Sequence, residues 1–269
     1  MKFIDISPKD NFREQIIQSI EKVIDSGNFV MGEEVRSFES QISSYLCRSH
    51  CITVGSGTDA LVIALRSLGL LEGDEVITSG FTFAASAEAI VLAGAVPVFA
   101  DVDLETGNIC PDSVNNLLNE KTKAVIPVSL FGRPYDYASF SYLNDLGIIV
   151  IEDGAQSFGA EIDGRKSCNL SEIACTSFFP TKPLGGYGDG GAIFTDCADT
   201  ADLCRSLRVH GQKGKYNHQL VGYCSRLDEM QAAILSLKLA RLDMEISARQ
   251  IVADRYNRAF NKLGINIFE

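Results

Sequence analysis

The sequence lacks long hydrophobic runs, basic clusters and an export signal. No apolar stretch approaches the roughly 20 residues that span a bilayer, so we expect no membrane-spanning helix. The N-terminal segment has an acidic residue early and no long apolar core, so we expect no signal peptide. The formal net charge of −11 and the absence of basic runs argue against general nucleic-acid binding. A phosphorylated ligand is still compatible with this charge, because a few local groups can hold it.

Histidine is scarce, and the cysteines show no metal-site spacing. The eight cysteines include no Cys-x-x-Cys pair, and the three histidines do not complete a zinc pattern. In a chain without an export signal, reduced thiols are the simplest interpretation. The sequence therefore predicts a cytoplasmic protein with no metal and no disulfide.

What is present describes an α/β protein. The 269 residues are 46% hydrophobic and 22% charged, which fits one large domain or a large domain plus part of a second. Short apolar segments alternate with amphipathic ones, and this alternation predicts a mainly parallel sheet covered on both faces. The predicted strands are 51–54, 75–78, 96–100, 124–128, 148–151 and 192–195, and the predicted helices are 8–26, 32–46, 61–70, 84–93, 111–118, 137–146, 198–208 and 228–260. The polar segment 211–222 is predicted to be a long loop with a function.

The first candidate site follows the first predicted strand. The segment Gly55-Ser-Gly-Thr-Asp-Ala60 stands at a helix start, where backbone N–H groups and hydroxyls can hold a phosphate. It also matches the G-x-G-x-x-A dinucleotide pattern, which needs an acidic residue at the end of the next strand. That strand ends in Thr78-Ser-Gly-Phe81, so the sequence favours a simple phosphate site. Ser56 or Thr58 could also serve as a plain helix N-cap under either interpretation.

Two further candidates lie later in the chain. Asp153 follows a buried strand, where a carboxylate either caps a helix or stays ionised beside a partner such as a protonated ring nitrogen. Lys182 stands between an aromatic-proline turn and a run of glycines, a setting that can hold an amine rigidly and partly desolvate it. The alternative is a solvated lysine in a surface turn.

A phosphate site, a carboxylate and a desolvated lysine are together what pyridoxal 5′-phosphate (PLP) requires. The phosphate binds a helix N-terminus, the ring nitrogen pairs with an aspartate, and the aldehyde reacts with a lysine. The segment Phe81-Thr-Phe83 could place an aromatic ring over the cofactor. The sequence therefore predicts a PLP site.

These segments resemble the DegT/DnrJ/EryC1/StrS sugar aminotransferases. The matching segments are Gly55-Ser-Gly-Thr-Asp-Ala-Leu, Phe81-Thr-Phe-Ala-Ala, Pro97-Val-Phe-Ala-Asp-Val-Asp, Ile151-Glu-Asp-Gly-Ala-Gln and Ser177-Phe-Phe-Pro-Thr-Lys. The resemblance covers nearly the whole chain in unbroken order. Segment 165–195 looks closest to the UDP-2-acetamido-2-deoxy-3-oxo-glucuronate aminotransferases.

The resemblance implies the type I fold of PLP-dependent transferases. This is an α/β fold with a mainly parallel central sheet covered by helices and, in this chain, an incomplete C-terminal small domain. The implied division is an N-terminal arm and helix (1–30), a large PLP-binding domain (31–240) and the start of a truncated small domain (241–269).

The resemblance also implies catalytic roles for Lys182 and Asp153. Lys182 would form the Schiff base with the cofactor aldehyde, and Asp153 would pair with the ring nitrogen. PLP-dependent sugar dehydratases, which are related, usually have histidine at the lysine position, so Lys182 argues against a dehydratase.

Five further residues are implied as cofactor contacts. Gln156 would lie beside the ring, and Phe83 would cover one of its faces. Gly57, Thr58 and Ser177 would bind the phosphate.

The reaction implied is transfer of an amino group from glutamate to a keto-sugar nucleotide. The resemblance favours a UDP-linked 3-keto sugar and a place in surface polysaccharide or lipopolysaccharide biosynthesis. It also implies a homodimer in which the loop from Tyr216 to Arg226 reaches the neighbouring subunit's site. His218 and Arg226 are the substrate contacts that this loop would supply.

The chain departs from the family pattern in two places. Cys224 stands where many members have an asparagine that contacts the phosphate from the other subunit, and a thiol is a weaker donor than an amide. The chain also ends at Glu269, before the expected small domain. The alternative function is therefore a catalytically impaired, cofactor-binding or regulatory homologue, or a fragment of such an enzyme.

Overall fold

A seven-stranded sheet forms the centre of the computed structural model, which describes residues 6–8 and 10–265. The strands are β1 (His50–Val54), β2 (Glu75–Ser79), β3 (Val96–Ala100), β4 (Thr122–Ile126), β5 (Ile149–Asp153), β8 (Ile173–Ser177) and β9 (Gly191–Thr195). Their order across the sheet is β1-β9-β8-β5-β4-β2-β3. Strand β9 pairs antiparallel with both neighbours, whereas the pairings from β8 to β3 are parallel. The prediction of an α/β fold with a mainly parallel sheet is confirmed.

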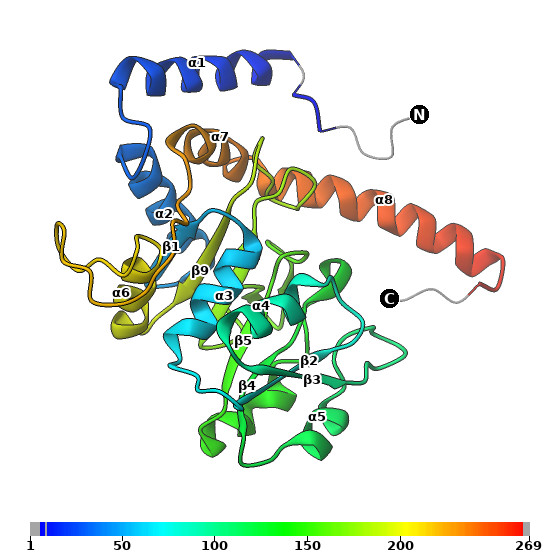
Figure 1. Ribbon diagram of the computed structural model, residues 1–269. Helices are drawn as coiled ribbons and strands as arrows, with labels where there is room; N and C mark the ends of the chain where they lie inside the picture. The colour runs from blue at the N-terminus through cyan, green and yellow to red at the C-terminus, as the bar shows by residue number, and fades with distance from the viewer. Residues whose placement is uncertain (1–5, 9, 266–269) are drawn as a thin grey trace.

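The helices cover both faces of this sheet (Figure 1). They are α1 (Asp10–Ser26), α2 (Glu33–Leu46), α3 (Gly57–Ser67), α4 (Ala85–Ala93), α5 (Pro111–Leu117), α6 (Ala198–Leu207), α7 (Glu229–Leu239) and α8 (Leu242–Lys262), with 3₁₀ segments η1 (Leu130–Gly132) and η2 (Ala138–Leu146). A small separate hairpin is formed by β6 (Glu161–Ile162) and β7 (Arg165–Lys166).

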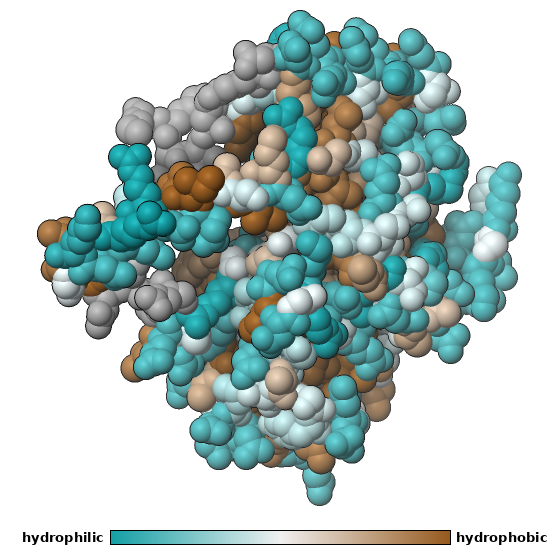
Figure 2. All heavy atoms as spheres, turned by 180° about the vertical axis from the view of Figure 1, so that it is seen from behind, coloured by the Kyte–Doolittle hydropathy of each residue, from teal (hydrophilic) through white to brown (hydrophobic). Residues whose placement is uncertain are grey.

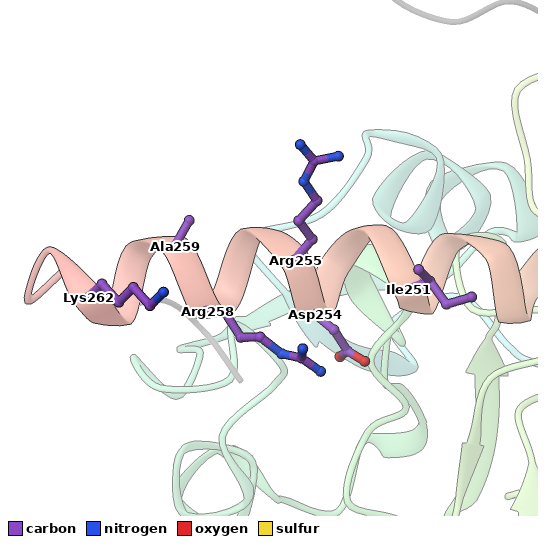
Figure 3. A pocket seen from close by; sticks show the side chains of 6 residues that line it. All are labelled: Ile251, Asp254, Arg255, Arg258, Ala259 and Lys262. Carbon is purple, nitrogen blue, oxygen red and sulfur yellow. The ribbon is translucent and has the colours of Figure 1, made fainter.

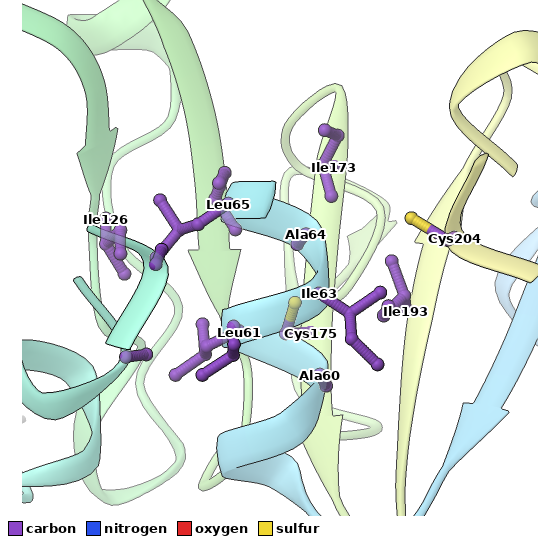
Figure 4. Packing of buried hydrophobic residues seen from close by; sticks show 14 of the residues in the cluster. Ala60, Leu61, Ile63, Ala64, Leu65, Ile126, Ile173, Cys175, Ile193 and Cys204 are labelled. Carbon is purple, nitrogen blue, oxygen red and sulfur yellow. The ribbon is translucent and has the colours of Figure 1, made fainter. Parts of the chain in front are cut away.

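Helix α3 is the most deeply buried helix on one face of the sheet. Its six residues from Ala60 to Leu65 are all buried, as expected for a helix that is apolar all round. Figure 4 shows these side chains beside Ile173 and Cys175 of β8 and Ile193 of β9. The helix therefore sits tightly against the sheet, and its N-terminus is held close to the strand ends.

On the opposite face, α2 and α7 enclose a second core rich in aromatic residues. Phe38 from α2 meets Phe178 edge to face, with ring centroids 5.4 Å apart. A third core lies between β2, β4 and β5 on one side and α5 and η2 on the other. The strand that carries Asp153 is thus packed on both faces.

Strand β8 was not among the predicted strands. It has only one strongly apolar residue, Ile173, followed by Ala, Cys, Thr and Ser, so its hydrophobic signal is weak. Its burial comes from its position between β5 and β9 rather than from its composition. The segment 137–146, predicted as a helix, is helical but of the 3₁₀ type.

The segment 228–260 is helical as predicted, but it forms two helices that are separated at Ala240–Arg241. Helix α7 ends at Leu239 and packs its apolar side into the core, whereas α8 begins at Leu242 and leaves the body of the protein. The buried face of α7 cannot continue along α8, where Leu242 alone is buried among the described side chains. Figure 2 shows the projecting arm of α8, on which hydrophilic side chains predominate with hydrophobic ones among them. No helix in the described ranges is long and apolar enough to cross a membrane.

Candidate active site

A pocket of about 480 Å³ opens at the carboxyl ends of the parallel strands, where open α/β sheets bind ligands. Its lining comes from the start of α3, the segment that leads into α4, the segments that follow β4 and β5, and the segment between β8 and β9. The lining residues are Ser56, Gly57, Thr58, Leu61, Thr82, Phe83, Ala85, Val128, Asp153, Ala155, Gln156, Ser177, Phe179, Thr181, Lys182 and Asp189. All seven residues predicted as cofactor contacts are in this set, so the fold brings them together from four separate segments.

The N-terminus of α3 forms one wall of the pocket. Ser56 is the N-cap, and its Oγ accepts a hydrogen bond from the Asp59 N–H at 3.0 Å. A Cβ on Gly57 would lie 2.6 Å from the Ser177 Cβ, so only glycine allows the helix start to approach β8 this closely. The N-terminal end of the helix dipole therefore lies beside the Ser177 hydroxyl, which is a setting that favours an anion.

Asp59, for which the sequence indicated no role, connects this wall to a distant segment. Its Oδ2 accepts a hydrogen bond from Ser225 Oγ at 2.7 Å, and Ser225 Oγ in turn accepts one from Gly55 N–H at 2.9 Å. Ser225 was not predicted, because its partners are some 170 residues away in sequence. These two hydrogen bonds of Ser225 hold segment 223–226 against the start of α3.

Asp153 ends β5 and is 6% exposed. Its Oδ2 accepts a hydrogen bond from Ser86 Oγ at 2.9 Å, and its Oδ1 accepts one from Ala155 N–H at 3.1 Å. Burial raises the pKa of Asp153, while the two hydrogen bonds and the charge of Lys182 oppose this rise. Ser86 contacts a site residue, and the sequence did not reveal this because its partner Asp153 lies 67 residues away.

Lys182 is held by a tight turn. Its own N–H donates to Phe179 O at 2.9 Å, and the Gly186 N–H donates to Phe178 O at 2.7 Å. A Cβ on Gly185 would lie 2.4 Å from Pro180 O, which explains a glycine in this close turn. Burial lowers the pKa of the half-buried Lys182 amine, and the charge of Asp153 partly opposes this. The structure therefore favours the desolvated lysine over a fully solvated one.

Gln156 and Phe83 lie at the mouth of the pocket. Gln156 Oε1 accepts a hydrogen bond from the Phe131 N–H at 3.0 Å, which orients its amide. The Phe83 ring is 68% exposed, so it is available to cover a ligand.

His218 and Arg226 do not line this pocket. The His218 Nδ1 lies 3.0 Å from His210 O, and Arg226 Nη2 lies 3.0 Å from Cys224 Sγ. Their predicted contact with a substrate requires a neighbouring subunit and stays a prediction.

Comparison with known proteins identifies the family. The model of the DegT/DnrJ/EryC1/StrS aminotransferase family matches residues 10–268. The chain belongs to this family. It is 45% identical to UDP-2-acetamido-2-deoxy-3-oxo-D-glucuronate aminotransferase of Pseudomonas aeruginosa, over 98% of this chain and 74% of that protein. It is also 45% identical to a pleiotropic regulatory protein of Geobacillus stearothermophilus, over 95% of this chain and 69% of that protein.

The fold agrees with a solved structure of a family member: the DegT/DnrJ/EryC1/StrS aminotransferase of Brucella abortus superposes with a TM-score of 0.92 at 39% identity, covering 97% of this chain and 73% of that one. The crystal structure of NtdA from Bacillus subtilis with bound cofactor PMP superposes with a TM-score of 0.92 at 31% identity, covering 98% of this chain and 61% of that one. The predicted type I PLP fold, the aminotransferase class and the cofactor are therefore confirmed at the level of the family.

The residues of the pocket fit PLP. The α3 N-terminus and Ser177 provide an anion site for the phosphate, and Lys182 provides an amine within the same pocket. The buried carboxylate of Asp153, whose pKa is raised by burial, would gain a charged partner in a protonated ring nitrogen. When bound there, the cofactor supplies the electron sink that amino-group transfer needs.

Proposed function

We propose that this protein transfers an amino group from glutamate to a keto-sugar nucleotide, with a UDP-linked 3-keto sugar as the substrate. The observation that carries the proposal is the convergence of Lys182 and Asp153 in one pocket beside the α3 N-terminus. The substrate class is supported by the Pseudomonas aeruginosa relative, whose name describes a UDP-linked 3-oxo sugar acid. We place the reaction in surface polysaccharide or lipopolysaccharide biosynthesis.

Lys182 is the residue we assign to covalent cofactor attachment and proton transfer. Because burial lowers its pKa, a larger fraction of the amine is neutral at a given pH than for a solvated lysine. A neutral amine can attack a carbonyl carbon and, once released, can accept a proton from the amino donor and return it. The turn from Phe179 to Gly186 keeps this amine in the pocket.

Asp153 is the residue we assign to holding the ring nitrogen protonated. Ser86 and the Ala155 N–H fix both carboxylate oxygens, so the side chain is oriented before any ligand arrives. A fixed negative charge in a buried site interacts strongly with a cation.

The assembly and location are also proposals. We propose a cytoplasmic homodimer in which His218 and Arg226 contact the substrate of the neighbouring subunit. We also propose the division into an arm (1–30), a large domain (31–240) and the start of a small domain (241–269), with α8 beginning at the last boundary.

A regulatory, non-catalytic homologue is the second candidate. The observation that favours it is the name of the Geobacillus stearothermophilus relative, a pleiotropic regulatory protein. The presence of both Lys182 and Asp153 in one pocket favours the enzyme.

The test begins with absorption spectra of the purified chain after addition of PLP, then borohydride reduction and peptide mapping. We expect a visible band from the lysine–cofactor bond and a reduced adduct on Lys182. In Lys182→Ala the band and the adduct should be absent; an unchanged band would contradict the assignment. Amino transfer from glutamate to a UDP-linked 3-keto sugar then distinguishes the enzyme from a regulatory homologue, which would bind PLP without turnover.

A further inference from the structure

A second pocket is also lined by the Lys182 turn. It has a volume of about 400 Å³ and shares Thr181 and Lys182 with the first pocket. Its remaining lining comes from the N-terminal segment, the turn, α7 and the start of α8. These residues are Ile6, Ser7, Pro8, Phe12, Pro180, Pro183, Tyr187, Lys238, Arg241, Glu245 and Arg249. A ligand in this pocket would therefore border Lys182 without contacting the α3 N-terminus.

The second pocket is cationic although the whole chain is acidic. Lys238, Arg241 and Arg249 face it with the single carboxylate of Glu245. None of the three cations forms an ion pair within 4.0 Å with any residue of the described ranges. In a chain of net charge −11, three cations that have no ion pair among the described residues and lie in one pocket with Lys182 indicate a site for an anion.

Arg241 has a buried donor that has no partner among the described residues. Its Nε is buried and makes no hydrogen bond within the described part of the chain. The guanidinium lies over the Phe12 ring, 4.3 Å from the centroid, which fixes the plane of the group without using its N–H donors. Because the Nε is enclosed by the protein, an anion in the pocket would bind the Nη groups of Arg241.

Lys238 links this pocket to the turn that carries Lys182. Its Nζ donates to Gly185 O, and it also lies over the Tyr187 ring at 5.2 Å. Burial lowers the pKa of Lys238, the charge of Glu245 raises it, and Arg249 lowers it. Lys238 therefore connects the cationic pocket to the backbone of the turn through its contact with Gly185 O.

We propose that the second pocket is an anion subsite, which binds a carboxylate or phosphate of the substrate through Arg241 and Arg249. This inference rests on the proposed function, because it assigns the pocket to the substrate whose reacting group meets Lys182. Two sources of the anion share this chemistry: the side-chain carboxylate of the amino donor and the diphosphate of the sugar nucleotide. Arginine binds either group in a bidentate way.

The test is calorimetric titration of the PLP-loaded full chain with two probes that cannot react. Glutarate represents the dicarboxylate of the amino donor, and inorganic pyrophosphate represents the nucleotide's diphosphate. The variants are Arg241→Gln and Arg249→Gln, which keep a polar side chain without the charge. The control is Arg255→Gln on the same helix, outside the pocket. Figure 3 shows Arg255 on one side of α8, with Asp254 and Arg258 on the other side. All the residues that line the pocket drawn there belong to α8.

We expect one probe to bind the unmodified protein, and each pocket variant to bind it about tenfold more weakly or worse. Arg255→Gln should bind it unchanged, and equal thermal unfolding midpoints would show that all variants fold. Glutarate binding would assign the subsite to the amino donor, and pyrophosphate binding would assign it to the nucleotide. If neither probe binds, or if the pocket variants bind as well as the control, the proposal is overturned. These titrations do not depend on turnover, so the two proposals can fail separately. A protein that shows no amino transfer but binds a probe through Arg241 would contradict the proposed function and would still support the anion subsite.

Discussion

The last two residues of β5 place two carboxylates in two different environments. Asp153 points to the face of the sheet that carries α3 and α4, and Glu152 points to the opposite face, because successive strand residues alternate. Glu152 is 0% exposed, and its Oε1 accepts hydrogen bonds from Ser167 Oγ at 2.6 Å and Ser129 Oγ at 3.4 Å. Its Oε2 accepts one from the Leu170 N–H at 3.3 Å. Burial raises the pKa of both carboxyls.

The difference lies in where the partners come from. The surroundings of Glu152 are complete within the protein, since the three donors above, the Cys168 N–H and the charge of Arg48 act on it. Asp153 has two donors and faces a pocket, so part of its surroundings is left for a ligand. Burial and a raised pKa alone therefore do not distinguish a functional carboxylate from a structural one; the open side does.

Asp153→Asn should have the largest effect on activity. We expect turnover to fall on the order of 10²–10³-fold, because an amide cannot hold the ring nitrogen protonated. Stability of the cofactor-free protein should not fall at neutral pH. The raised pKa means that the contribution of Asp153 to stability is present at low pH and is lost as pH rises through the folded-state pKa. Asparagine does not titrate, so the free energy of unfolding should depend less on pH in the variant. Urea unfolding between pH 4 and pH 8 measures this dependence. Unchanged turnover would contradict the assignment.

Gly57→Ala should weaken cofactor binding next most strongly. The new Cβ would lie 2.6 Å from the Ser177 Cβ, so the α3 N-terminus must move away from β8. Overpacking of this kind costs about 1–3 kcal/mol, which corresponds to about 5- to 150-fold in the Kd for PLP if the shift falls on the phosphate site. Gly80→Ala is the matched control, because a Cβ there meets nothing within 4 Å. Equal affinities for the two variants would show that the close approach to Ser177 does not matter.

Glu152→Gln should lower stability and leave activity nearly unchanged, which is the opposite of what we expect for Asp153→Asn. The amide turns one acceptor oxygen into a donor that faces the Ser167 hydroxyl or the Leu170 N–H. We expect a loss of about 1–3 kcal/mol in the free energy of unfolding, with little change in turnover per folded molecule. Denaturant unfolding and steady-state kinetics on the same preparation measure both. If this variant keeps its full stability and loses activity, Glu152 has a functional role like that of Asp153, and the comparison of their surroundings is wrong.

Ser86→Ala should have the smallest effect. It removes the donor to Asp153 Oδ2, a contact that contributes about 1 kcal/mol. Because this hydrogen bond lowers the pKa of Asp153, its loss should raise that pKa further. The acidic limb of the pH–rate profile should then move to higher pH. Ser86→Thr keeps the hydroxyl and should restore the profile. A uniform fall in rate at every pH would indicate a packing defect instead.

Several features could not be predicted because their signal lies in distant contacts. Strand β8 is weakly apolar, and only its position between β5 and β9 buries it. Ser86 and Ser225 act through partners far away in sequence, and a serine in a helix or loop gives no local sign of such a role. The cationic pocket combines the N-terminal segment with α7 and α8, which no motif connects.

The sequence by itself determined the alternation of strands and helices and the segments that carry the cofactor chemistry. Apolar periodicity, glycines at close approaches and the order of Gly57, Asp153 and Lys182 are local properties, and local properties can be read from a chain. Only the tertiary structure decided which neighbour each polar group faces. The fold made Glu152 a closed internal acceptor and Asp153 an open one, and it bent the chain at Arg241 so that its guanidinium faces Lys182's second pocket. Burial and pairing are properties of the assembled fold, because they depend on segments that meet only when the chain is folded.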